Sequence, residues 1–443
     1  MLPFPLPQII AAARAAANPA TAVRTHLRWQ REQLWVGDRA YQPARIFLVG
    51  VGKAAEQMTA AACALLGTRL YQGILIHKRG RVLPPLPPSI HPYPADHPIP
   101  TQDNLHATQA VLDLLAHTTP DDLVLCLISG GTSALLTQPS LPLADWQALS
   151  QALLACGCSI QEFNRVRQFL DPIKGGGLAI AAAPAPCASL ILSDVVGNPL
   201  DIIGSGPTVP VVKQAAVVRH ILERYGVKDR LSLTTQQQLD QQLATIPDTR
   251  PDHVMPVAQF GYNHVVADGQ RLATAAAEAA RLAGFSTQIL TTHLQGEAQT
   301  VGQVAAALAQ DAAPGSCLLL AGETTVTLST QAGRGGRNQE MALAAALALA
   351  GVEGVVVASW ASDGEDGPTP AAGAWITGQT VLMAGQASLT AADYLARHDS
   401  YTFFQRLAES HSAAGSLIHT GPTGTNVNDL VIILRYSSEQ TYL

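Results

Sequence analysis

The sequence predicts an α/β protein with two domains. At 443 residues, the chain is longer than a single hydrophobic core usually supports, so two cores are expected. Short apolar, β-branched runs alternate with Ala- and Leu-rich stretches over most of the length, which is the pattern of βα units and largely parallel sheets. We expect a Rossmann-like parallel-sheet domain over residues 1–250 and a second α/β domain over 251–443. The junction is expected near 245–260, where "TIPDTRPDHVMP" follows Gln- and Thr-rich helices.

The individual elements follow from the same alternation. The expected strands are the short apolar runs at 46–50, 73–77, 123–128, 189–193, 317–321, 355–359 and 430–434. The expected helices are the Ala-rich stretches at 54–66, 142–156, 271–283, 298–311 and 340–350. Residues 81–101 are dense in proline, which excludes a helix or a central strand there. We interpret this segment as a structured excursion that brings His91 or His97 toward a site.

Composition narrows the class of protein. A net charge of −6 and a pI near 6.1 argue against a nucleic-acid partner, which calls for a basic face. Six cysteines in a chain of this length do not form a disulfide framework, so a reducing, cytoplasmic location is expected. The longest apolar segment, residues 341–360, is interrupted by Gly351, Glu353 and Gly354 and fails as a membrane span. We expect a soluble protein without a membrane partner.

Glycine clusters follow most of the expected strands. In open α/β sheets, loops beyond the carboxyl ends of strands present backbone N–H groups to anionic ligands. Two of the five lysines, Lys53 and Lys174, lie in such clusters, where an ammonium group can meet a phosphate. The clusters are GVGKAA (50–55), SGGTSALL (129–136), IKGGGLA (173–179), SDVVGNPLDIIGSGPTVP (193–210), GETTVTL (322–328), GRGGRNQE (333–340), SDGEDGPTPAAG (362–373) and GPTGTNVNDL (421–430).

The first cluster permits two interpretations. Gly50, Gly52 and Ala55 match the dinucleotide-binding pattern G-x-G-x-x-G/A. A Rossmann NAD site also requires an acidic residue about 20 residues further on, but the next strand ends in "HKRGR". Arginines there leave an NADP site open. Lys53 inside the turn favours contact with a phosphate that is being transferred.

Several carboxylates follow the expected strands and are candidate metal ligands or catalytic bases of the expected site. Phosphoryl transfer from ATP requires Mg²⁺, which is held by one or two carboxylates and the nucleotide's own oxygens. Asp363 and Asp366, three apart in a glycine-flanked turn, are the most suggestive metal ligands, and Asp194 is a candidate for holding the metal or orienting a hydroxyl. Each of these carboxylates, like Glu323 and Asp429, has helix capping as its alternative role.

Eleven ordered blocks between about residues 45 and 434 resemble one family. They include "GVGKAA", "ISGGTSALL", "FNRVRQFLDPIKGG", "SGPTVP", "GRGGRNQE" and "TGPTGTNVNDL". This set is similar to the glycerate 2-kinases of the MOFRL type, some members of which carry the older label hydroxypyruvate reductase. The MOFRL module corresponds to about residues 315–436.

The resemblance implies ATP- and Mg²⁺-dependent phosphorylation of D-glycerate to 2-phosphoglycerate, in a cleft between two α/β domains. We expect a monomer or homodimer. The resemblance implies that Lys53 and Arg337 are catalytic, and Asp194, from the carboxylates at strand ends, is a third candidate. The glycerate carboxylate is expected to meet Arg167 or Lys174. The expected substrate- or ATP-binding residues are Gly50, Gly52, Ser129, Gly130, Gly131, Ser133, Arg167, Lys174, Ser205, Gly206, Glu323, Asn338 and Asn426.

Some positions depart from the family pattern. Asp96 precedes His97 where members read A-G-H-P, Gly177 replaces an arginine, and Ser362 stands where many members have threonine. These changes question the phosphate contact beside Lys174 and the acceptor selectivity. An NADP-linked hydroxypyruvate reductase and a non-catalytic sugar-acid or nucleotide sensor remain as alternatives.

Overall fold

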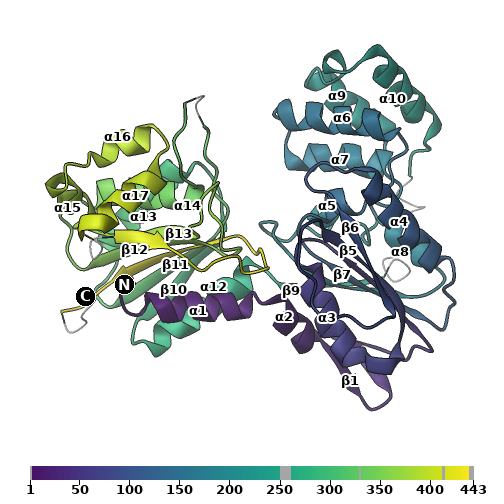
Figure 1. Cartoon of the computed structure of the whole chain (residues 1–443), viewed down its shortest axis with the longest axis horizontal. Coiled ribbons are helices and arrows are strands. Elements are labelled where there is room, and N and C mark those ends of the chain that lie inside the picture. The colour runs from purple at the N-terminus through teal and green to yellow at the C-terminus, as the bar shows by residue number, and fades with distance from the viewer. Residues whose placement is uncertain (1, 250–260, 329–330, 412–414, 439–443) are drawn as a thin grey trace. The chain divides into compact units, whose positions relative to one another are not determined.

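The computed structural model describes residues 2–249, 261–328, 331–411 and 415–438. The chain divides into two compact units (Figure 1). The parallel-sheet unit contains Pro19–Ser193 and Asn198–Val266, and the mixed-sheet unit contains Met1–Asn18, Asp194–Gly197 and Ala267–Leu443. The predicted α/β class with two domains is confirmed.

A six-stranded sheet forms the centre of the parallel-sheet unit, in the order β6-β5-β4-β7-β8-β9. The pairings among β4 to β8 are all parallel. β4 and β7 are buried at every residue, which explains their uninterrupted apolar runs. The strands are β4 Ile46–Val51, β5 Leu70–Lys78, β6 Ile90–Ala95, β7 Leu123–Ile128, β8 Cys187–Leu192 and β9 Tyr262–Ala267.

Helices and a small antiparallel sheet complete this unit. A second core holds the helices α6, α7, α9 and α10 together (Figure 1), and it includes Leu149, Phe163 and Leu222. The remaining elements are α2 Pro19–His26, β1 Leu27–Gln30, β2 Gln33–Val36, β3 Arg39–Tyr41, α3 Ala55–Leu66, α4 Gln102–Leu115, α5 Thr132–Leu135, α6 Leu143–Ala155, α7 Ile160–Leu170, α8 Gly177–Ala182, α9 Ala215–Arg224 and α10 Leu233–Thr245, with short 3₁₀ turns at Gly67–Arg69, Ile203–Ser205 and Lys228–Arg230.

The proline-dense segment forms the edge strand β6, a place where proline is tolerated because one side of the strand is unpaired. The prediction that this segment forms no central strand is confirmed, but the edge strand was not predicted. After β6 the chain passes Asp96 and His97 before α4 begins at Gln102, with a capping box between Thr101 and Asn104. The excursion therefore returns His97 to the carboxyl edge of the sheet.

The mixed-sheet unit has a six-stranded sheet in the order β10-β11-β15-β12-β13-β14. Only β10 and β11 are parallel, and the other pairings are antiparallel, so the expectation of a largely parallel sheet is wrong here. The last strand, β15, inserts between β11 and β12, and residues 362–372 connect β12 to its antiparallel neighbour β13. The strands are β10 Ser286–Leu294, β11 Ser316–Gly322, β12 Val355–Ala361, β13 Gly373–Thr377, β14 Gly415–Ile418 and β15 Asp429–Arg435.

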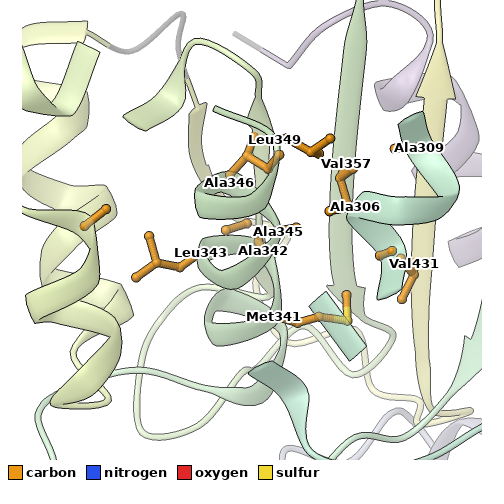
Figure 2. Close-up of a cluster of buried hydrophobic side chains, with 14 of the residues drawn as sticks. Ala306, Ala309, Met341, Ala342, Leu343, Ala345, Ala346, Leu349, Val357 and Val431 are labelled. Atoms are coloured by element: carbon orange, nitrogen blue, oxygen red, sulfur yellow. The ribbon is translucent and has the colours of Figure 1, made fainter. Parts of the chain in front are cut away.

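Small side chains allow close helix packing in this unit. A Cβ on Gly302 of α13 would lie 2.3 Å from the carbonyl oxygen of Met341 on α14, so glycine is required where these helices meet. Figure 2 shows the buried cluster around α14, with Ala342, Ala345 and Ala346. The helices of the unit are α1 Leu6–Ala16, α12 Gly269–Leu282, α13 Ala298–Asp311, α14 Arg337–Ala348, α15 Thr380–Gln386, α16 Ala391–Ala396 and α17 Ser400–His411.

The boundary between the two units differs from the single domain boundary expected at residue 250. The predicted junction at 245–260 falls mainly on residues 250–260, outside the described residues. Strand β9 extends the parallel sheet, so the division comes at residues 266 and 267. The apolar face of α1 packs against α12, which assigns residues 1–18 to the mixed-sheet unit. In the part of the chain that the structure describes, no helix is long and apolar enough to cross a membrane.

Candidate active site

The turns that follow β4 and β7 are joined at the carboxyl edge of the parallel sheet. Lys53 donates its backbone N–H to the carbonyl of Gly130 (2.8 Å), and the N–H of Ala54 donates to Ser129 Oγ (3.1 Å). Gly52 has a φ of 124°, and a Cβ there would lie 2.1 Å from Ser129 Oγ. Glycine is therefore required for both conformation and space. The residues Gly50, Gly52, Ser129, Gly130 and Gly131, which the sequence singled out, lie in these two joined turns.

A second pair of turns adjoins these. Ser133 Oγ lies 2.9 Å from Ser205 Oγ, which also donates to Asn164 Oδ1 (2.7 Å). The carbonyls of Ser205 and Gly206 accept the N–H groups of Gly175 (3.1 Å) and Gly176 (2.8 Å). Four glycine loops of the parallel-sheet unit thus form one connected surface at the strand ends.

Cations surround a histidine on this surface. A Cβ built on Gly131 would lie 3.2 Å from both His97 Cδ2 and Lys53 Cγ, so the two side chains flank the glycine. Burial, together with the positive charges of Lys53, Lys78 and Arg167, lowers the pKa of His97 to about 4. His97 is therefore neutral in a strongly electropositive surrounding, which suits an anionic ligand.

Arg167 retains its place among the candidate ligand residues. Its guanidinium lies over the ring of Phe163, 3.7 Å from the centroid, in the last turn of α7. Burial lowers its pKa to about 10, and Asp171 opposes that shift. Arg167 and Ser133 line the same small hollow. Arg167 stays charged at neutral pH.

Lys174 has a different position from the one expected. Its side chain is completely buried, and Nζ donates to the carbonyls of Leu136 and Thr132, the latter at 3.4 Å. Burial lowers its pKa to about 8, with Asp171 opposing and Arg167 assisting. Lys174 therefore holds the turn at the end of the SGGTSALL loop and does not present its ammonium to a ligand.

The departures from the family pattern have local explanations. A Cβ on Gly177 would lie 1.7 Å from the carbonyl oxygen of Pro172, so this backbone excludes an arginine at that position. Asp96 accepts from Arg79 Nε (3.0 Å) and Thr101 Oγ1 (2.7 Å), and Arg79 is the largest cause of its lowered pKa. Asp96 thereby anchors the segment that carries His97.

In the mixed-sheet unit, Arg337 at the start of α14 is bound by two carboxylates. Its Nε and Nη2 donate to Asp429 Oδ2 (2.5 Å) and Oδ1 (2.9 Å), and Nη2 lies 3.1 Å from Glu323 Oε1. The Asp429 contact is bidentate, a geometry specific to arginine. Burial raises the pKa of Asp429 to about 7, and the Arg337 hydrogen bonds act against that rise. Arg337 is fixed in orientation by this pair.

The expected metal pair is not formed. The carboxylate of Asp366 is buried and accepts the N–H groups of Asn338 (3.1 Å) and Gln339 (2.9 Å), together with the Gln339 side chain (2.9 Å). Asp366 and Asn338 therefore belong to the cap of α14, the alternative role considered above. Asp363 Oδ1 accepts the N–H of Glu365 (3.0 Å) within its own turn. Among the described residues, no group of three or more metal-ligating side chains is gathered.

The remaining candidates lie in connecting segments. Asp194 follows β8 in the short segment that is grouped with the mixed-sheet unit. Asn426 accepts the N–H of Asn428 (3.0 Å), so it supports the turn before β15. Glu323, at the carboxyl end of β11, lines a cavity of about 420 Å³ together with Arg337. The sequence placed His97 near a site without giving it a role, and it did not identify Lys78 as a site residue.

Known proteins match this chain over nearly its whole length. Two family models match it: a domain of unknown function, DUF4147, over residues 6–240, and the MOFRL family over residues 316–429. A D-glycerate 2-kinase from Thermotoga maritima is 37% identical and covers 88% of this chain and 90% of that protein. A putative hydroxypyruvate reductase from Agrobacterium vitis is also 37% identical, covering 97% and 93%. The crystal structure of a glycerate kinase from Thermotoga maritima has a TM-score of 0.83 at 34% identity, covering 96% of this chain and 97% of that chain.

The protein is of the α/β class and combines two domains. The DUF4147 match falls mainly on the parallel-sheet unit, and the MOFRL match falls on the mixed-sheet unit. Within that class, the chain belongs to the glycerate kinase family.

Proposed function

We propose that this chain is a D-glycerate 2-kinase, which transfers the γ-phosphoryl group of ATP to the 2-hydroxyl of D-glycerate and releases 2-phosphoglycerate and ADP. The observation that carries the proposal is the set of joined glycine turns at the carboxyl edge of the parallel sheet, where Lys53 and neutral His97 flank Gly131 and the positive charges of Lys78 and Arg167 also act on His97. Such a surface binds anionic oxygens, and both substrates carry them.

Each residue of this surface has a role in the proposal. Lys53 neutralises the charge that spreads over the transferring phosphoryl oxygens, which is the main task of a catalyst of phosphoryl transfer. Arg167 binds the glycerate carboxylate, because it is the charged and partly accessible partner where Lys174 is buried. His97, held neutral, accepts a hydrogen bond from the 2-hydroxyl and orients it.

Arg337 and Asp194 remain proposed catalytic residues. Asp429 fixes the guanidinium plane of Arg337, so that its remaining N–H groups are directed without further loss of side-chain entropy. A cleft formed by the two units, with closure over the substrates, stays a prediction.

A magnesium ion bound by Asp363 and Asp366 does not fit, because Asp366 already accepts donors from α14. We propose that Mg²⁺ enters with the ATP phosphates, where it would neutralise charge on the β- and γ-oxygens. A magnesium requirement is tested by titrating the ion against fixed ATP.

The test of the proposed activity is direct. The protein is incubated with ATP, Mg²⁺ and D-glycerate, ADP is followed by a coupled assay, and the product is identified by phosphorus NMR. Formation of 2-phosphoglycerate is expected, with 3-phosphoglycerate absent. ADP formation that does not depend on D-glycerate would refute the proposal.

A hydroxypyruvate reductase is the second candidate, favoured by the G-x-G-x-x-A match and by the name of the Agrobacterium vitis relative. The end of β5 carries Lys78 in place of the carboxylate that would bind a ribose of NAD. NADPH oxidation with hydroxypyruvate, at a rate above that of phosphorylation, would establish this candidate.

We further propose a cytoplasmic monomer or homodimer. The location follows from the cysteine usage of the sequence, which is not that of a disulfide framework. Light scattering during size-exclusion chromatography distinguishes the two oligomeric states.

A further inference from the structure

The mixed-sheet unit contains a cavity of about 420 Å³ whose ligand nothing above assigns. This volume lies within the range of roughly 300–1,000 Å³ that small-molecule sites have. It is much larger than glycerate requires. Val326, Leu328 and Pro368 supply apolar surface, and Gly333, Gly335 and Gly336 keep one wall free of side chains.

The polar groups of the cavity are mainly hydrogen-bond acceptors. Glu323, at the carboxyl end of β11, is partly exposed on this wall. The nearby guanidinium of Arg337 is already shared between Glu323 and Asp429. Glu340 is buried and accepts from Gln299 Nε2 (2.8 Å). The carboxylates therefore outnumber the one permanent cation on this wall.

The N–H groups at the start of α14 do not offset this excess of negative charge. Helix N-termini bind anions through unpaired N–H groups, but here Asp366 accepts the N–H groups of Asn338 and Gln339. These two N–H groups are therefore not available to a phosphate group.

A histidine completes the cavity. His398, whose φ is 53°, lines the cavity together with Glu340. Its Nδ1 lies 3.1 Å from both carboxylate oxygens of Glu340. This pair fixes the ring and leaves Nε2 on the opposite side, where one hydrogen bond to a planar ligand is possible.

We propose that this cavity binds the nucleoside part of the phosphoryl donor, a purine base with its ribose. The base packs between Val326, Leu328 and Pro368, while Glu323 accepts hydrogen bonds from the ribose hydroxyls, as acidic residues at strand ends do in dinucleotide sites. An uncharged, donor-rich ligand is the kind that carboxylates and apolar side chains bind together. The inference rests on the proposed kinase function for the identity of the donor.

Adenosine is the probe, because it has the base and ribose without phosphates. Binding of adenosine to the full chain is measured by calorimetry, and its inhibition of ADP formation is measured against ATP and against D-glycerate. The variant Val326→Trp fills the cavity. Leu282→Trp, on the exposed end of α12, is the matched control for adding a tryptophan.

We expect adenosine to bind the wild-type chain and the control, to compete with ATP, and to lose measurable binding in Val326→Trp. In that variant, KM for ATP rises by at least about tenfold while KM for D-glycerate stays within about twofold. Glu323→Gln tests the ribose contact, and it should raise KM for ATP more than KM for 2′,3′-dideoxy-ATP.

Two results would overturn the inference. One is an unchanged KM for ATP in Val326→Trp, and the other is a rise confined to D-glycerate, which would make the cavity the acceptor site. Failure of the kinase proposal is distinguishable, because it removes D-glycerate-dependent ADP formation from the wild-type chain while adenosine binding is still measured.

Discussion

Replacing Lys174 by methionine separates a structural role from a ligand-binding role. The ammonium of Lys174 is fully buried and donates to the carbonyls of Thr132 and Leu136. Methionine retains most of the volume and removes the charge and the donors. If the structural role is correct, the main consequence is a change in folding stability that depends on pH.

The magnitude follows from the pKa. Burial lowers the pKa of Lys174 from the ordinary 10.5 to about 8. Between these two pH values the unfolded chain holds a proton that the folded chain has released, so raising the pH favours the folded state. At about 1.36 kcal/mol per pH unit, the free energy of unfolding rises by about 3 kcal/mol over this window, relative to Lys174→Met. Below pH 8 the full penalty of the buried charge is present in the wild type.

The assay is urea unfolding followed by circular dichroism and tryptophan fluorescence, from pH 7 to pH 10.5, for the wild type and for Lys174→Met. Coincidence of the two signals checks that each transition is cooperative. Lys228→Met, a surface lysine paired with Asp240, controls for the loss of one charge from the chain.

The difference between wild type and Lys174→Met should become more favourable to the wild type as the pH rises. A flat or falling difference would refute the structural role. A variant of unchanged stability with a raised KM for D-glycerate would return Lys174 to the ligand-binding role that the sequence predicted.

Three further predictions concern the site. Lys53→Met should lower kcat by roughly 10²- to 10⁴-fold with an unchanged urea midpoint; near-normal turnover would contradict its role. Asp366→Ala should destabilise the protein by about 3 kcal/mol in urea unfolding, because it uncaps α14 and leaves buried donors unpaired, whereas Asp363→Ala should cost much less; equal effects would argue against the cap. Because the pKa of Asp429 is about 7, protonation below that pH removes its bidentate bond to Arg337; the wild-type pH–rate profile should fall on the acid side, and Asp429→Asn should abolish that dependence while lowering kcat.

Much of the fold could be predicted because its central strands are continuous apolar runs. β4, β7, β11, β12 and β15 were all expected within one or two residues. Several of the strands that were missed are edge strands, such as β6 and β14, where proline or polar residues weaken the pattern. The central strand β13 was also missed. Their existence depends on a neighbouring strand that supplies hydrogen bonds, which a local pattern does not show.

The arrangement of the glycine loops could be predicted better than the surroundings of individual side chains. Lys53 and the Ser129–Gly131 turn lie where the motif placed them. The sequence motifs predicted that both Lys174 and Asp366 face a ligand. In the structure, Lys174 is buried under the SGGTSALL loop, and Asp366 caps helix α14. The spacing of residues along the chain does not show which polar side chains are buried by helices or loops from elsewhere in the sequence.

By itself, the amino-acid sequence determined the α/β class, the two cores, the glycine turns at the strand ends and the membership of the glycerate kinase family. Those features depend on local periodicity and on residues adjacent in the chain. Only the tertiary structure decided that Lys174 is a buried support, that His97 stands neutral among Lys53, Lys78 and Arg167, and that the last strand β15 lies antiparallel inside the second sheet. The physical reason is that burial and charge are set by neighbours far away in sequence, and these determine whether a polar side chain binds a ligand or the protein itself.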